Sequence, residues 1–145
     1  MDVLVVAVGA AAEDALEAAE AVRQAGYTVR VVDPRWVQPV PPALADLARS
    51  AALVVSVEDG VVAGGVGARV SQAIRAAGVD TPTREIGVPV VFPSHGKVPD
   101  VKAAVGLTVQ DIGRRIVEWS ALVERSGDSS SDNASARTAD EIARD

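Results

Sequence analysis

Four short runs of mostly β-branched and other apolar residues are spaced along the first 90 positions of the chain. They lie at 3–9 (VLVVAVG), 28–33 (TVRVVD), 53–59 (LVVSVED) and 83–87 (TREIG). The first and third runs are apolar at nearly every position, which is typical of strands covered on both faces in a parallel sheet. The pattern therefore predicts four strands, of which the first and third are fully buried.

Amphipathic segments separate these runs, with apolar residues recurring at intervals of three and four positions. The first such stripe contains Ala12, Ala15, Leu16, Ala19 and Val22, and the second contains Val66, Val70, Ala73, Ile74 and Ala77. Residues at this spacing lie on one face of a helix, which is then buried against the sheet. Gly26 and Gly78 end the two predicted helices.

Two more helices are predicted near the middle and the end of the chain. Pro41 and Pro42 suit the first turn of a short helix over 41–50. Thr108 and Asp111 resemble a capping box, and an apolar stripe follows at positions 112, 116, 119 and 123. The segment between the fourth strand and this final helix is expected to be a loop.

This order of elements predicts the fold class. Strand and helix alternate three times, and a fourth strand, a loop and the final helix follow. Such an alternation is typical of α/β proteins with right-handed crossovers. We therefore expect a three-layer α/β/α sandwich around a mainly parallel sheet of about four strands.

The composition of the chain excludes several kinds of functional site. The chain has 145 residues, 48% of them hydrophobic, enough for one substantial core, and it contains no cysteine. Disulfides, thiolate nucleophiles and sulfur-ligated metals are therefore excluded. A net charge of −6 and few aromatic residues disfavour nucleic-acid binding. With neither a long apolar run nor a signal-peptide pattern, we expect a cytoplasmic protein without a membrane partner.

The last 20 residues differ from the rest of the chain. Residues 126–145 read SGDSSSDNASARTADEIARD and carry five acids against two arginines, half of the net charge. A segment this polar cannot bury enough apolar surface to offset the entropy of ordering it. We expect a folded domain over 1–125 and an acidic, disordered tail over 126–145.

The segment VEDGVVAGGVGARV at 57–70 is the first candidate for a binding site. Gly64, Gly65 and Gly67 follow a buried strand and open a helix, so their amides could form an anion nest. Glu58 and Asp59 stand at the mouth of this turn and would repel a phosphate. In the alternative interpretation, the glycines allow a wide turn and close packing, while the acids cap amides or pair with an arginine.

No catalytic constellation is apparent elsewhere. His95 is the only histidine, so neither a histidine-based metal site nor a relay between two imidazoles can be built. We expect His95 to fix a loop or to lie at an interface. Glu58 and Asp59 point to opposite faces of a strand, which argues against a pair of acid and base carboxylates. We predict no catalytic, cofactor-binding or metal-binding residue.

Four motifs, taken in chain order, point to a known family. These are DPRWVQP (33–39), VEDGVVAGGVGARV (57–70), FPSHG (92–96) and GLTVQDIGRRI (106–116). Together they resemble the C-terminal, transketolase-like domain of 1-deoxy-D-xylulose-5-phosphate synthase, especially in its actinobacterial form. The resemblance runs from about residue 3 to residue 123.

The resemblance implies an enzyme that condenses pyruvate with glyceraldehyde 3-phosphate and releases CO2, using thiamine diphosphate and Mg²⁺. That family binds its cofactor through earlier domains, in a motif that starts with G-D-G, and this string is absent here. The implied partners of this domain are the N-terminal and middle domains, within a homodimer. We therefore expect this chain to be a piece of a longer protein, to bind no cofactor and to be inactive alone.

The family also implies details of the fold. The strand order becomes second, first, third, fourth, so that the order reverses between the loops at Gly9 and Glu58. Glu58 and Asp59 are then expected to meet a neighbouring domain or an arginine such as Arg35 or Arg84. The glycines at 64, 65 and 67 serve the close start of the third helix.

Two other interpretations stay open. The chain could be the same domain of a 2-oxoacid dehydrogenase β-subunit or of a transketolase, which the DPRWVQP segment disfavours. It could also be a free-standing regulatory module that binds a nucleotide or another anion where the strand order reverses.

Overall fold

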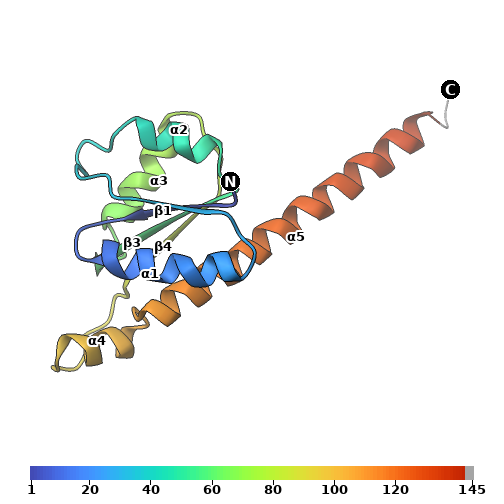
Figure 1. The fold of residues 1–145 in the computed structure, drawn as a ribbon. Helices are drawn as coiled ribbons and strands as arrows, with labels where there is room; N and C mark the ends of the chain where they lie inside the picture. Colours follow the sequence, from blue (N-terminus) through green and yellow to red (C-terminus); the bar gives the residue numbers. More distant parts are fainter. Residues whose placement is uncertain (143–145) are drawn as a thin grey trace.

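The computed structural model describes the backbone of residues 1–142 and the side chains of residues 1–127. Figure 1 shows strands and helices alternating along most of the chain. In chain order the elements are β1 (Val3–Ala7), α1 (Ala11–Gln24), β2 (Val29–Val32), α2 (Ala43–Arg49), β3 (Leu53–Val61), α3 (Val66–Ala76), β4 (Thr83–Val88), α4 (Val98–Val105) and α5 (Val109–Ile142).

The four strands form one parallel sheet in the order β2-β1-β3-β4. Val3 of β1 is in register with Val29 of β2 on one side and with Leu53 of β3 on the other. All five residues of β1 and the first six of β3 are buried. The predicted strands, their order and the burial of the first and third strands are confirmed.

Helices cover both faces of this sheet. Figure 1 shows α1 and α5 on one face and α2 and α3 on the other. Alternate residues of β1 point into two separate cores: Val3 and Val5 pack with α1 and α5, whereas Leu4 and Val6 pack with α2 and α3. The predicted three-layer α/β/α sandwich is confirmed.

The buried face of α1 differs from its predicted stripe. Ala15, Ala19 and Val22 are buried as expected, but Leu16 is 58% exposed. Ala11 and Ala18 are buried in its place, because α5 packs beside α1 and selects the small residues for close contact. The expectation for Leu16 was therefore wrong. Ala77 is also exposed, since α3 ends one residue before it.

The segment after β4 contains a helix where a loop was expected. α4 occupies Val98–Val105 and begins with a proline in its first turn, Pro99. It ends at Gly106, whose φ of 71° is the left-handed conformation that glycine adopts most easily. The prediction of a loop was wrong because this helix is only eight residues long and buries no side chain.

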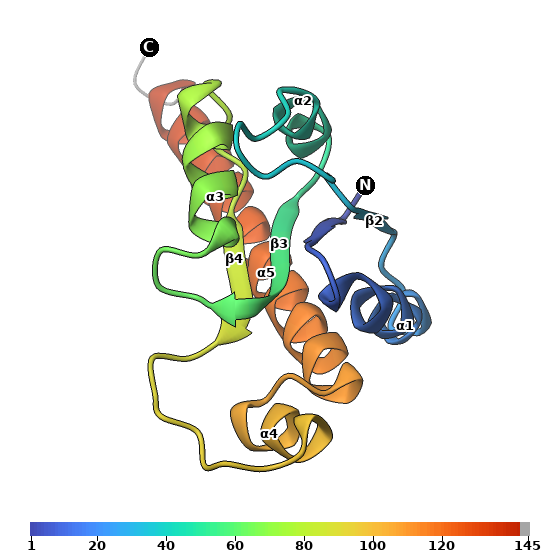
Figure 2. The same ribbon diagram turned by 90° about the vertical axis from the view of Figure 1, so that its left-hand side faces the viewer.

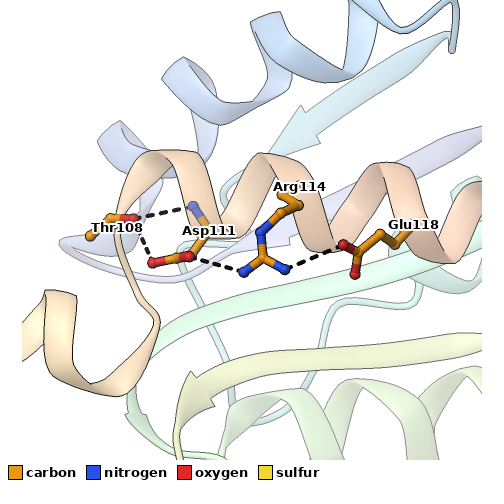
Figure 3. Close-up of polar contacts among 4 residues, drawn as sticks. All are labelled: Thr108, Asp111, Arg114 and Glu118. Carbon is orange, nitrogen blue, oxygen red and sulfur yellow. Dashed lines mark hydrogen bonds and ion pairs between the residues drawn. The ribbon is translucent and has the colours of Figure 1, made fainter.

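The N-cap bond of the predicted capping box is present at the start of α5, and Asp111 bonds back to the Thr108 hydroxyl in place of its backbone N–H (Figure 3). The backbone N–H of Asp111 donates to Thr108 Oγ1 at 3.1 Å, and the Thr108 hydroxyl donates to Asp111 Oδ2 at 2.6 Å. Arg114 then bridges Asp111 and Glu118 along the exposed side of the helix. Ile112 and Ile116 are buried, whereas Trp119 and Val123 are partly buried.

The structure continues α5 through Ile142, although the composition of residues 126–145 predicts disorder. In Figure 1 these last turns leave the body of the protein, away from the sheet and the other helices. Residues 143–145 of the predicted tail lie outside the described part of the chain.

Candidate functional site

The candidate site is the carboxyl edge of the sheet, where the strand order reverses between β1 and β3. Ligands of open α/β sheets bind at this place. Figure 2 shows β3 and β4 ending at the same edge, with the connection to α3 beside them and α4 beyond. The ladder between β3 and β4 is irregular between Val57 and Val61, so Glu58 and Asp59 lie at a bulge.

Glu58 occupies the amides that a phosphate would need. Its side chain is nearly buried, with the residue 6% exposed. Oε2 accepts a hydrogen bond from the Val66 N–H at 3.0 Å, and Oε1 accepts one from the Gly67 N–H at 2.9 Å. These N–H groups belong to the first turn of α3, where a helix favours a negative charge. The carboxylate thus caps α3 from eight and nine residues upstream.

The glycines of this turn are required by close contacts at Gly65 and Gly67 and by the backbone conformation at Gly64. A Cβ on Gly65 would lie 2.5 Å from Glu58 Oε1 and 2.6 Å from the carbonyl oxygen of Val61. A Cβ on Gly67 would lie 2.2 Å from Ser56 Oγ. Gly64 has a φ of 73°, a left-handed conformation that side chains disfavour. The three glycines therefore let α3 start directly against β3 and the Glu58 carboxylate.

Little space remains at the reversal point itself. The cavity there has a volume of about 10 Å³ and lies between the ends of β3, α1 and α4. That volume holds one water molecule at most. α4 closes it from outside, because Lys102 forms an ion pair with Asp14 of α1 across the gap. The reversal point between β1 and β3 therefore has no room for a diphosphate or a nucleotide.

Lys102 and Asp14 were missed by the reasoning from sequence. The pair joins residues 88 positions apart and depends on α4, which was taken for a loop. Pro99 near the start of that segment and Gly106 after its end were the available signals for a helix. Ser56 was also missed: its hydroxyl is buried beside Gly67 and has no hydrogen-bond partner in the described part of the chain.

The other predicted site residues do not contact this turn through polar groups. Asp59 is exposed, on the strand position after the buried Glu58. Arg35 lies between β2 and α2, where its N–H donates to Asp33 Oδ1 at 2.9 Å and its φ is 58°. His95 lies in the exposed connection between β4 and α4. Among residues 1–127, neither Glu58 nor Asp59 forms an ion pair with an arginine.

In the part of the chain that the structure describes, no group of three or more His, Asp or Glu side chains is placed to hold a metal ion. Within the same part, none of the helices combines the length and apolar character needed to cross a membrane.

Comparisons with known proteins agree with this geometry. The family described as transketolase, C-terminal domain, matches residues 1–112. A curated relative, the 1-deoxy-D-xylulose-5-phosphate synthase of Rhodococcus jostii, is 52% identical over 118 residues, which cover 81% of this chain and 18% of the relative. The enzyme of the same name from a Parafrankia species is 53% identical over 117 residues, with the same coverage of both chains.

A solved structure shows the same fold. A split-gene transketolase, described as an inactive β4 tetramer, superimposes with a TM-score of 0.71 and 30% sequence identity. The superposition covers 86% of this chain and 38% of that protein. This chain spans less than a fifth of the length of the curated relatives that it matches. On the match over residues 1–112, the chain belongs to the transketolase C-terminal domain family.

Proposed function

We propose that this chain is the C-terminal domain of a 1-deoxy-D-xylulose-5-phosphate synthase. The observation that carries the proposal is the identity of about half of the residues, over 81% of the chain, to relatives of that name. The enzyme would condense pyruvate with glyceraldehyde 3-phosphate and release CO2, a step toward isoprenoid precursors and thiamine. It would act in the cytoplasm as a homodimer.

Thiamine diphosphate and Mg²⁺, which this activity requires, do not fit the residues of this domain. The amides of Val66 and Gly67, which could cradle a diphosphate, already bind the Glu58 carboxylate. A second negative group at the same place would be repelled. The cofactor therefore belongs to the remainder of the larger protein, and the isolated chain is expected to give no turnover.

The role left to this domain is to support the arrangement of the catalytic parts. A displacement of about 1 Å at an active site can cost roughly 100-fold in rate, so a rigid domain packed on the catalytic ones affects the reaction indirectly. In this proposal Glu58 and the glycines at 64, 65 and 67 shape a rigid turn. The exposed Asp59, Arg35 and His95 are left for contacts with the N-terminal and middle domains.

An exchange of domains tests this proposal. Residues 1–125 of this chain replace the matching C-terminal segment of the Rhodococcus jostii synthase, and product is measured from pyruvate and glyceraldehyde 3-phosphate. We expect the chimera to retain activity, while the 145-residue chain alone has none. A soluble chimera that binds thiamine diphosphate but forms no product would contradict the proposal.

We also propose that residues 126–145 form an acidic tail that is disordered in solution and separate from the domain over 1–125. The support is the composition of the segment and the course of its described backbone, which leaves the body of the protein. The total helical signal in circular dichroism is compared between the 145-residue chain and a chain ending at residue 125. We expect the two signals to be equal. A smaller signal after truncation would show that the helix persists in solution.

A further inference from the structure

Apolar side chains gather in solvent on the segment that leads from β4 to α4. Val90 is 76% exposed, Phe92 105% and Val98 69%, and Val91 is exposed as well. Soluble monomers rarely expose apolar side chains in such groups, and groups of this kind mark interaction sites. We call residues 89–98 the apolar segment.

A cavity of about 430 Å³ opens beside the apolar segment. It lies where the β3–α3 connection, the end of β4, α4 and α5 meet, and we call it the Arg115 cavity. Residues that line it include Val62, Gly64, Glu85, Val90, Val105 and Arg115. Because Val90 belongs to both features, the apolar segment and the cavity form one continuous surface.

Arg115 brings a positive charge to this surface, and Glu85 is the carboxylate that shares the lining of the cavity with it. Its guanidinium lies 4.9 Å from the centre of the Trp119 ring, and among residues 1–127 it forms no ion pair. The adjacent Arg114, by contrast, pairs with Asp111 and Glu118. Burial lowers the pKa of Arg115, because removing a cation from water disfavours its charged form. A carboxylate supplied from outside would offset that cost.

We propose that the apolar segment and the Arg115 cavity are the docking surface for another segment of the larger synthase, one that carries a carboxylate for Arg115 among apolar side chains. This inference rests on the proposed function. The chain spans 18% of its curated relatives, so most of such a protein is available to cover the surface.

A second copy of this chain fits the surface less well. In a two-fold contact the same patch meets itself. Two hollow surfaces would then face each other and leave both cavities unfilled. A protruding segment that carries a carboxylate would instead fill the cavity and meet Arg115.

The absence of cysteine in this chain allows a direct test by thiol labelling. Phe92→Cys is made in the isolated chain and in the chimera with the Rhodococcus jostii enzyme, and maleimide labelling of its peptide is followed by mass spectrometry. We expect labelling about ten-fold slower in the chimera, because the docked segment covers the thiol. Leu16→Cys is the control, since Leu16 is exposed on α1 outside this surface, and its rate should be equal in both proteins.

A charge reversal then tests the role of Arg115. Arg115→Glu in the chimera that carries Phe92→Cys should restore the fast labelling of the isolated chain. Arg114→Glu is the matched control, because Arg114 is the neighbouring arginine and already has its ion pairs within the chain. Its labelling should stay slow.

The outcomes separate this inference from the proposed function. An active chimera in which Phe92→Cys is labelled as fast as in the isolated chain would overturn the docking surface and leave the function standing. An inactive chimera with slow labelling would overturn the proposed function and leave the docking surface standing. Slow labelling already in the isolated chain, together with a dimer in sedimentation velocity that Phe92→Ser disrupts, would assign the surface to a second copy and overturn the inference.

Discussion

The two connections at the carboxyl edge of the sheet differ in whether their polar and apolar groups find partners within the domain. After β3, the chain folds a buried carboxylate back onto the first amides of α3, and three glycines make room for it. After β4, the chain exposes apolar side chains and forms a helix that buries none. The first connection is complete within the domain, whereas the second leaves surface that another polypeptide can cover.

This difference shows that a sequence pattern alone does not tell whether a segment is free to bind a ligand or a partner. The glycine-rich turn has the composition of a phosphate-binding loop, yet its donors are already used internally. The segment VPVVFPSHGK at 88–97 has no pattern typical of a ligand-binding loop, yet it presents the exposed apolar groups and leads to the cavity at Arg115. The function of an anion-binding pattern is therefore decided by which acceptor reaches its amides.

The largest expected loss of stability comes from adding a side chain at Gly65, in the connection between β3 and α3. Gly65→Ala places a methyl group against the Val61 carbonyl oxygen and the Glu58 carboxylate. Because one of these neighbours is backbone, we expect a loss of about 3 kcal/mol in the free energy of unfolding, or roughly 10 °C in Tm. Gly96→Ala is the control, since the nearest atom to its added Cβ lies at an ordinary contact distance of 3.7 Å. An unchanged Tm for Gly65→Ala would show that the turn is loosely packed.

A smaller loss should follow from changing the cap itself. Glu58→Gln keeps one oxygen acceptor and therefore leaves one of the two α3 amides without a partner, which costs about 2 kcal/mol. Chemical denaturation measures the change. Asp59→Asn alters the exposed neighbour and should stay within about 0.5 kcal/mol. Equal effects of the two changes would contradict the distinct role of Glu58.

The second connection should tolerate the loss of its ion pair with α1. Lys102→Gln removes the ion pair with Asp14, whose members are 33% and 25% exposed, and partly exposed pairs contribute about 1 kcal/mol or less. We expect little change in global stability but faster amide hydrogen exchange in α4, because that helix has no buried side chain to hold it. A global loss above about 2 kcal/mol would mean that α4 is part of the core.

The smallest expected effect is on the stability of the protein at low pH. It involves Asp111, in the first turn of α5. The Thr108 hydroxyl, and then Arg114, hold the pKa of the Asp111 carboxyl below its usual 3.8. Since the folded pKa is the lower one, the stabilisation is complete above the unfolded value and is lost as the pH falls through the folded value. Asp111→Asn should therefore reduce the dependence of stability on pH below 3.8. An unchanged acid profile in thermal melts would refute this assignment.

The sheet could be predicted from sequence because its interior strands are apolar at nearly every position. Val3 and Leu53, for example, begin short β-branched runs that are typical of a strand buried on both faces. The face of α1 was less predictable, since any apolar residue at helical spacing fits the pattern. The position of α5 decided that Ala18 is buried and Leu16 exposed.

The candidate site was only half predictable for a related reason. The pattern of acids and glycines allowed both an anion nest and an internal cap, because sequence does not show which way a side chain folds. The bulge at the end of β3 and the contact from Glu58 to residues 66 and 67 decide between them. The closure by Lys102 required knowledge of α4, a helix too short for a periodic signal.

The central claim is that Glu58 occupies the amides of α3 that an anion would need. Its most direct test is a titration of the isotope-labelled chain with inorganic pyrophosphate, monitored through the amide resonances of Val66 and Gly67. If the Glu58 carboxylate occupies these donors, both resonances should stay in place up to millimolar ligand. Saturable shifts at both amides would show instead that the turn binds anions and that Glu58 leaves it in solution.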